Sequence, residues 1–84
     1  MELKDTVELM NSNNYKERFK AEYLQTKIRY DKLEKMLIKY KAKTLEFTPS
    51  CDISILSDQL WYMQNYLRML QIRAEIEGVD LERI

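Results

Sequence analysis

Apolar residues in the second half of the chain recur on two faces of what reads as one helix. One set advances in steps of four and three residues, and the other recurs every seven residues. The first set is Leu56, Leu60, Met63, Leu67, Leu70 and Ala74, and the second is Ile55, Tyr62, Met69 and Ile76. At about 100° per residue the two sets lie well over 90° apart around the helix. One partner helix cannot cover both faces, so we expect the second face to pack against another copy of the chain or a different protein.

The first half of the chain follows the same rhythm of four and three and predicts a long helix. Its apolar positions are Phe19, Tyr23, Thr26, Tyr30, Leu33, Leu37 and Tyr40. Asn14 followed by Glu17 resembles a capping box, and lysines gather at the other end, where the helix macrodipole favours cations. We therefore place the first long helix over residues 14–42. Gly78 predicts a left-handed stop, which places the second long helix over residues 52–77.

The remaining segments are short. A brief N-terminal helix over residues 2–11 carries apolar side chains that can cover an exposed face of the hairpin, and residues 78–84 form a tail. In the connector between the long helices, Leu45 and Phe47 are expected to fold over the end of the hairpin. We predict an all-α single domain over residues 1–84: an antiparallel hairpin of two long helices with a short N-terminal helix, assembling into a helical-bundle oligomer.

Size and charge support a partner. A chain of 84 residues buries only about 60% of the surface that its unfolded form exposes, so self-association would supply missing burial. The net charge is zero, with 14 basic and 14 acidic residues, but the charges are unevenly placed. Residues 14–43 carry 10 basic and 4 acidic groups, 10 − 4 = +6, whereas residues 44–84 carry 3 and 7, 3 − 7 = −4. The basic segment favours an anionic ligand or an acidic neighbouring subunit.

Candidate catalytic chemistry is sparse. The chain has no histidine, and its single cysteine has no imidazole partner to activate it and no second cysteine for a disulfide. It has one glycine, so no glycine-rich loop can cradle a phosphate, and we expect no enzyme activity, cofactor or metal. No apolar stretch approaches the roughly 18 residues of a membrane span. We expect a cytoplasmic protein without a membrane partner.

Basic and aromatic residues alternate along the first long helix. They are Tyr15, Lys16, Arg18, Lys20, Lys27, Arg29, Tyr30 and Lys32. Cations of this kind bind phosphate, and tyrosine rings stack on bases. Tyr15 stands at the helix start, where free backbone N–H groups favour an anion. Lysines and arginines also cover most solvated helix faces, so this pattern alone leaves nucleotide binding and an ordinary polar surface both open.

Several spacings resemble a known family. They are Tyr15-x-x-Arg18-Phe19-x-x-Glu22, Leu33-x-x-x-Leu37 and Leu56-x-x-Gln59-x-x-x-Met63-x-x-Tyr66-x-x-x-Leu70-x-x-Arg73. Together they are similar to small helical proteins of crAss-like phages, a group that looks like the anti-CBASS sponges of cyclic oligonucleotides. The resemblance spans Tyr15 to Ile76. Much of it is general hairpin patterning, and the combination of Gln59, Met63, Tyr66 and Arg73 is its more specific part.

The resemblance implies a phage counter-defence protein. Such proteins form hexamers of helical hairpins and capture cyclic di- and trinucleotide immune signals without cleaving them. For this chain we expect a homo-oligomer, likewise a hexamer, that binds cyclic oligonucleotides and not long nucleic acid. In the dinucleotide pocket, a tyrosine that stacks on a base corresponds to Tyr15. A cation that holds phosphate corresponds to Arg29 or, in another register, to Lys27. Arg73 matches the arginine of the trinucleotide pocket, and Arg18 completes the candidate ligand-binding set.

The connector and the lysine- and tyrosine-rich first helix differ from what is usual in that family, so the ligand can differ too.

Two other functions fit the same pattern. The chain could instead be a protein-binding inhibitor or adaptor that docks through Trp61, Tyr62, Met69 and Ile72, since aromatic and methionine side chains are frequent at such interfaces. A purely structural hairpin without a ligand is the third alternative.

Overall fold

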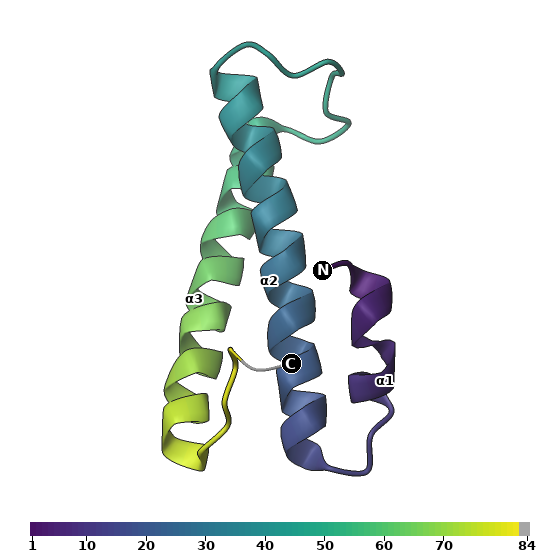
Figure 1. Ribbon diagram of the computed structural model, residues 1–84. Coiled ribbons are helices and arrows are strands. Elements are labelled where there is room, and N and C mark those ends of the chain that lie inside the picture. Colours follow the sequence, from purple (N-terminus) through teal and green to yellow (C-terminus); the bar gives the residue numbers. More distant parts are fainter. Residues whose placement is uncertain (83–84) are drawn as a thin grey trace.

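The chain folds into helices only, in a computed structural model that describes residues 1–82. A short 3-10 turn, η1 (Leu3–Thr6), leads into α1 (Val7–Met10), and two long helices follow, α2 (Tyr15–Lys41) and α3 (Ile53–Glu77). No β-strand occurs within the described residues. The two long helices run antiparallel and pack against each other, and α1 lies beside α2 on the side away from α3 (Figure 1). The all-α hairpin expected from the apolar pattern is confirmed.

Helix α2 begins with a cap that differs from the predicted capping box. The side chain of Asn14 accepts a hydrogen bond from the backbone N–H of Lys16 at 2.9 Å, as expected of a cap. The carboxylate of Glu17, however, accepts from the hydroxyl of Ser12 at 3.0 Å, and the same hydroxyl accepts from the backbone N–H of Asn14. The reciprocal half of the box is therefore replaced by a serine that links the loop to the first turn.

The helix ends use two left-handed residues. Gly78 closes α3 with φ of 70°, and the N–H of Val79 returns to the carbonyl of Ala74 at 2.9 Å, which confirms the predicted stop. After α2 the left-handed position is taken by Lys43, with φ of 62°. A residue with a Cβ is strained in this conformation by roughly 1 kcal/mol. Lys43 therefore ends α2 at a cost in conformational energy that a glycine would avoid.

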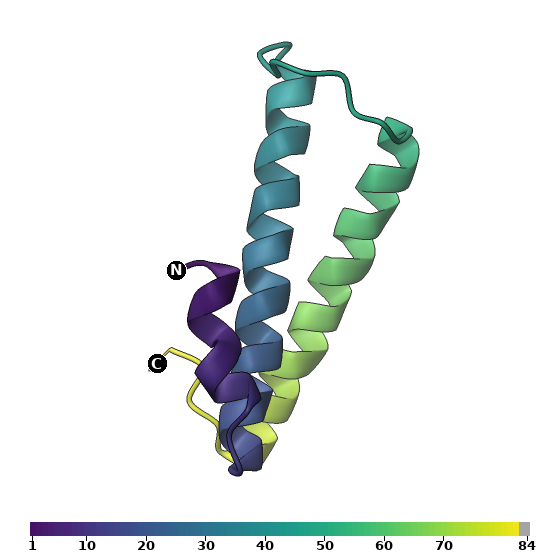
Figure 2. The same cartoon turned by 90° about the vertical axis from the view of Figure 1, so that its right-hand side faces the viewer.

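The long helices pack most closely near the start of α2 and the end of α3 and diverge toward the connector (Figure 2). We call the closely packed end, which lies opposite the connector, the closed end. The closed end holds the main apolar cluster, built from Phe19, Leu70, Ala74 and Val79, with Tyr23 and Leu81 packed against it. Toward the connector, Leu56, Leu60 and Met63 are only half-buried. The predicted core stripe of α3 is thus buried fully only in its C-terminal part.

The N-terminal segment covers the back of α2. Thr6 is fully buried, and its hydroxyl accepts a hydrogen bond from the side-chain amide of Gln25 at 3.1 Å and donates to the carbonyl of Leu3. Ala21 and Leu24, which point away from α3 on α2, are buried as well. The segment lies against α2 as expected, but Thr6 makes the buried contact, whereas the apolar side chains of Val7 and Met10 remain 48% and 46% exposed.

The connector between the long helices does not fold over the hairpin as predicted. Leu45 is half-buried, but Phe47 is 59% exposed. The long helices diverge toward this end (Figure 2), and Phe47 borders a hollow with Tyr40, Leu45 and Pro49 without being buried by them. The predicted tail residue Ile84 lies outside the described residues.

Candidate functional site

The candidate binding residues fall into separate places on the hairpin. Tyr15 and Arg73 lie at its closed end, at the start of α2 and near the end of α3. Lys27 lies at mid-length and faces α3, where it lines a hollow between the two helices. Arg29 is exposed and, two residues further on, points about 200° around α2 from Lys27.

Arg73 is held between an aromatic ring and a carboxylate. Its guanidinium carbon lies 4.7 Å from the ring centre of Phe19, a cation–π contact. Its Nε donates a hydrogen bond to the carboxylate of Glu77 at 2.8 Å, one helical turn further along α3. Because Phe19 belongs to the apolar cluster and is only 4% exposed, its ring is a fixed platform. The packing of the core therefore positions an exposed cation.

Charges from both helices act on this guanidinium. The hydrogen bond to Glu77 raises the pKa of Arg73, desolvation partly opposes this increase, and the electrostatic effects of Glu77, Glu22 and Tyr15 add to it. Arg73 thus remains cationic at every physiological pH. Glu22 comes from α2, so the first turns of α2 contribute to the electrostatic environment of Arg73 near the end of α3.

Tyr15 is available, but the helix start around it is not. Its side chain is 49% exposed. The backbone N–H groups of the next three residues are all occupied, because Lys16 donates to the side chain of Asn14, and Glu17 and Arg18 donate to the carbonyl of Asn14. The fold therefore uses several of the N–H groups that were expected to be free for an anion, and the exposed ring of Tyr15 is the part of this residue that a ligand can reach.

Arg18 has a structural contact. Its Nη1 donates to the backbone carbonyl of Ser12 at 2.8 Å and so ties the loop after α1 to the first turns of α2. The side chain remains exposed. A ligand would compete with this bond for one of the five donors of the guanidinium.

The hollow at mid-length combines cations with phenol and amide groups. It measures about 200 Å³ and is lined by Tyr23, Lys27, Tyr30, Gln64, Leu67, Arg68 and Gln71. Lys27 Nζ lies 2.9 Å from the carboxylate of Asp31 and 5.6 Å from the centre of the Tyr30 ring. The hydrogen bond to Asp31 raises the pKa of Lys27, against a lowering by desolvation. The hollow offers an anion one cation from each long helix.

Arg68 is the member of this hollow that sequence reasoning missed. It lies in the acidic half of the chain, where the charge count directed attention elsewhere. A signal did exist, because Gln64, Arg68 and Gln71 are spaced by four and three residues and form a polar stripe beside the core stripe.

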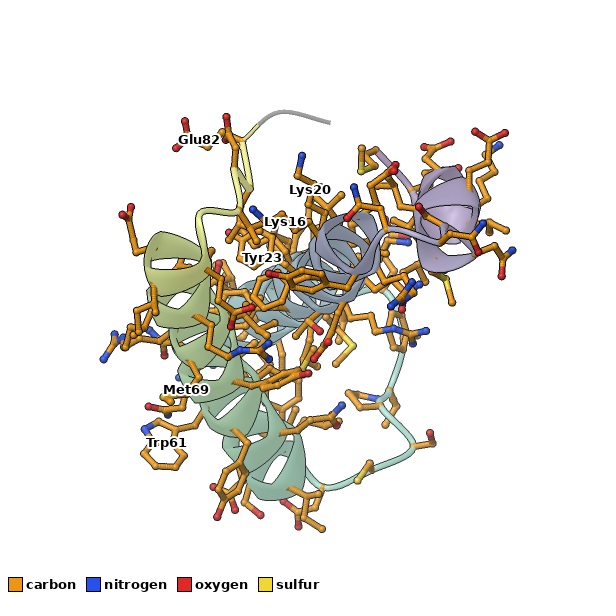
Figure 3. The ribbon with its side chains drawn as sticks, turned by 90° about the horizontal axis from the view of Figure 1, so that it is seen from below. Lys16, Lys20, Tyr23, Trp61, Met69 and Glu82 are labelled. Atoms are coloured by element: carbon orange, nitrogen blue, oxygen red, sulfur yellow. The ribbon has the colours of Figure 1, made fainter. Side chains whose placement is uncertain are left out.

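The C-terminal tail lies beside the basic face of α2. Figure 3 shows Lys16 and Lys20 rising from α2 next to the tail that carries Glu82. A Cβ added at Gly78 would meet the ammonium group of Lys16 at 3.9 Å, so this lysine reaches the C-terminal end of α3. A cation there is favoured by the helix macrodipole, and the charge of Lys16 is therefore partly used within the fold.

The second apolar face of α3 is uncovered. Ile55, Tyr62, Met69 and Ile76 are each between 57% and 78% exposed. Figure 3 shows Trp61 and Met69 pointing away from α2. Beside this stripe lies an apolar hollow of about 520 Å³ that includes Met63 and Tyr66. The two-faced helix inferred from the sequence is therefore present, with one face packed against α2 and the other open.

Among residues 1–82, no group of three or more His, Cys, Asp or Glu side chains is arranged to hold a metal ion. None of the helices in this part of the chain is both long and apolar enough to cross a membrane.

Comparison with known proteins gives one family match. The model of a family described as Sequestin matches residues 13–76, which include the whole of α2 and nearly all of α3. No curated protein and no solved structure matches the chain.

Proposed function

The chain belongs to the Sequestin family, and from this membership we propose that it is a non-catalytic phage protein that sequesters cyclic di- and trinucleotide immune signals in pockets of a homo-oligomer. The family name denotes sequestering, which is binding without conversion. Cyclic nucleotides as the ligand are supported by the resemblance of the residue spacings to the anti-CBASS sponges. The proposed action is in the host cytoplasm, where such signals are made.

The observation that carries the proposal is the site around Arg73. A cyclic oligonucleotide presents phosphates and bases joined through ribose rings, so its binding sites need cations for the phosphates and exposed rings for the bases. At the closed end of the hairpin, Arg73 on its rigid platform, Phe19, supplies the cation for the proposed trinucleotide pocket, and the half-exposed ring of Tyr15 serves the proposed dinucleotide pocket. The hollow with Lys27 and Arg68 is the second proposed anion site.

A sponge acts through affinity. It lowers the free concentration of the signal below the level that activates a host effector, and it needs neither a base nor a nucleophile. Binding between subunits would exclude water from the phosphate contacts and hold the cations in a fixed geometry, which strengthens each contact. The open stripe of α3, from Ile55 to Ile76, is the proposed subunit interface, and a hexamer is the proposed assembly.

The test combines mass measurement with titration. We expect the full chain to be an oligomer by light scattering and to bind a panel of cyclic di- and trinucleotides by calorimetry. Denaturation of the complex should release the ligand intact, which separates sequestration from hydrolysis. A monomeric chain that binds no cyclic nucleotide would contradict the proposal.

Two substitutions connect binding to the proposed residues. Arg73→Ala and Tyr15→Ala should each weaken binding by about tenfold or more, because charged or stacking contacts contribute about 1–3 kcal/mol. The family resemblance assigns Arg73 to trinucleotides and Tyr15 to dinucleotides, so each variant should affect mainly one ligand class. Lys35→Ala, which removes an exposed cation elsewhere on α2, is the matched control and should bind as the wild type does.

A second candidate function rests on the same open stripe. Trp61, Tyr62 and Ile72 are all exposed, and their rings and methyl groups could dock a host or phage protein. This adaptor function predicts a chain that remains monomeric until its partner is added and that has no affinity for cyclic nucleotides. The titration above therefore separates the two candidates.

A further inference from the structure

The proposed cation at the closed end already has an anionic partner. Glu77 accepts the Nε–H of Arg73 at 2.8 Å, while the ring of Phe19 covers one face of the guanidinium. A phosphate that binds an arginine through two parallel hydrogen bonds can use the edge formed by Nε and one Nη. That edge is the one that Glu77 occupies.

We propose that Glu77 is an internal competitor for anions at Arg73 and thereby sets which ligands the site retains. This inference rests on the proposed function. A ligand phosphate and the Glu77 carboxylate seek the same donor, and their like charges repel at the few ångströms that separate two partners of one guanidinium. Glu22 acts electrostatically on the same group and adds to the repulsion.

The ion pair is weak enough to be displaced. The side chains of Arg73 and Glu77 are 49% and 27% exposed, and pairs this accessible to water are only marginally stable. A ligand with several phosphates gains enough at its other contacts to move the carboxylate aside. A ligand with a single negative charge lacks those contacts, so Glu77 favours polyanionic ligands over monoanions.

A different role for Glu77 makes a different prediction. If the carboxylate only orients Arg73, a glutamine in its place preserves that role, because its amide oxygen still accepts the Nε–H bond. In that case Glu77→Gln binds as the wild type does, and Glu77→Ala binds less tightly. If Glu77 competes, both substitutions increase affinity, since both remove the negative charge.

The experiment titrates the full chain with three adenosine ligands that differ in charge: cyclic AMP, cyclic di-AMP and the cyclic trinucleotide. We expect Glu77→Gln to bind the trinucleotide about two- to tenfold more tightly than the wild type, the effect of removing one partly screened charge. Binding of cyclic AMP should also become measurable or stronger. Glu75→Gln is the matched control, because it removes the same charge from the same helix end but lines a hollow with Tyr23 instead. It should change the affinity little.

The possible outcomes separate this inference from the proposed function. Unchanged or weaker binding by Glu77→Gln, with binding still lost in Arg73→Ala, overturns the competitor role and leaves sequestration standing. An equal gain in Glu75→Gln also overturns it, because the effect would then be one of net charge. Failure of both the wild type and Glu77→Gln to bind any of the three ligands overturns this inference, and the proposed function is overturned only if the wider panel of cyclic di- and trinucleotides also fails to bind.

Discussion

At Phe19 one side chain serves both the core and the surface. Its ring closes the apolar cluster with Leu70 and Ala74, and its accessible face carries the guanidinium of Arg73. Because the ring cannot move without disturbing the cluster, the cation above it loses little freedom when a ligand binds. Affinity at this end of the hairpin therefore depends on core packing as well as on charge.

Another single residue, Asp52, gives the fold a dependence on pH. Its carboxylate caps α3 by accepting hydrogen bonds from the backbone N–H and the hydroxyl of Ser54. Both bonds lower the pKa of Asp52, and the backbone bond has the larger effect. A carboxylate with a lowered pKa in the folded state stabilises the fold above its unfolded pKa, about 4, and this contribution is lost as the pH falls through the folded value.

Asp52→Asn should reduce this acid sensitivity. Asparagine is an equally good cap but does not titrate. We expect the urea midpoint of the variant to fall less between pH 6 and pH 2.5 than that of the wild type. Asp58→Asn, which changes an exposed carboxylate further along α3, should follow the wild type. An Asp52→Asn midpoint that falls as steeply as the wild type would show that the cap is not the acid-sensitive group.

At the scale of helices, the two ends marked by left-handed residues should respond in opposite ways to substitution. Gly78→Ala should destabilise the fold by about 1 kcal/mol, because φ of 70° is strained for any residue with a Cβ. The added methyl group meets only the far end of Lys16 at 3.9 Å, so the cost is conformational. Lys43→Gly should stabilise by up to about 1 kcal/mol, since it removes the same strain after α2. Urea unfolding of the two variants measures both changes, and a shift of the same sign in both would contradict this account.

Much of the helix layout follows from local sequence. The four-three spacing identifies the buried face of α3, and Gly78 marks its end, because both signals act within a few residues. The divergence of α2 and α3 is not encoded this way, so local sequence does not predict that Phe47 is exposed. Glu17 likewise accepts a hydrogen bond from Ser12 and not from the backbone N–H of Asn14, the donor that a capping box predicts. A long side chain can reach several donors, and the loop conformation decides which of them is near.

The candidate site was less predictable than the fold. Sequence spacing identifies Tyr15 and Arg73 only through resemblance, and it gives no sign that Phe19 lies beneath Arg73 or that Glu77 pairs with it. The contact between Phe19 and Arg73 joins residues 54 positions apart, 73 − 19 = 54, so it depends on how the two helices are aligned. Arg68 was missed for the same reason: its relevance comes from the lysine opposite it on α2.

At the scale of the whole molecule, the open stripe of α3 predicts self-association. Met69→Glu and Ile76→Glu each place a charge in the proposed interface, and burying an unpaired charge costs several kcal/mol. We expect either variant to lower the mass measured by light scattering while circular dichroism remains that of a helical protein. Ile38→Glu is the control, because Ile38 is equally exposed but lies on α2. A stripe variant that keeps the wild-type mass would indicate that assembly uses another surface.

The placement of the main apolar cluster at the end remote from the connector has a consequence for the continuity of the chain. Phe19 comes from one side of the connector, and Leu70, Ala74 and Val79 come from the other. A protease that cuts after the exposed Lys43 would sever the backbone without touching any of these contacts. The two fragments would still recognise each other, with an affinity that depends on their concentration, since cleavage removes only the entropic benefit of the covalent link. The hairpin is thus suited to being split into two separately produced halves that reassemble.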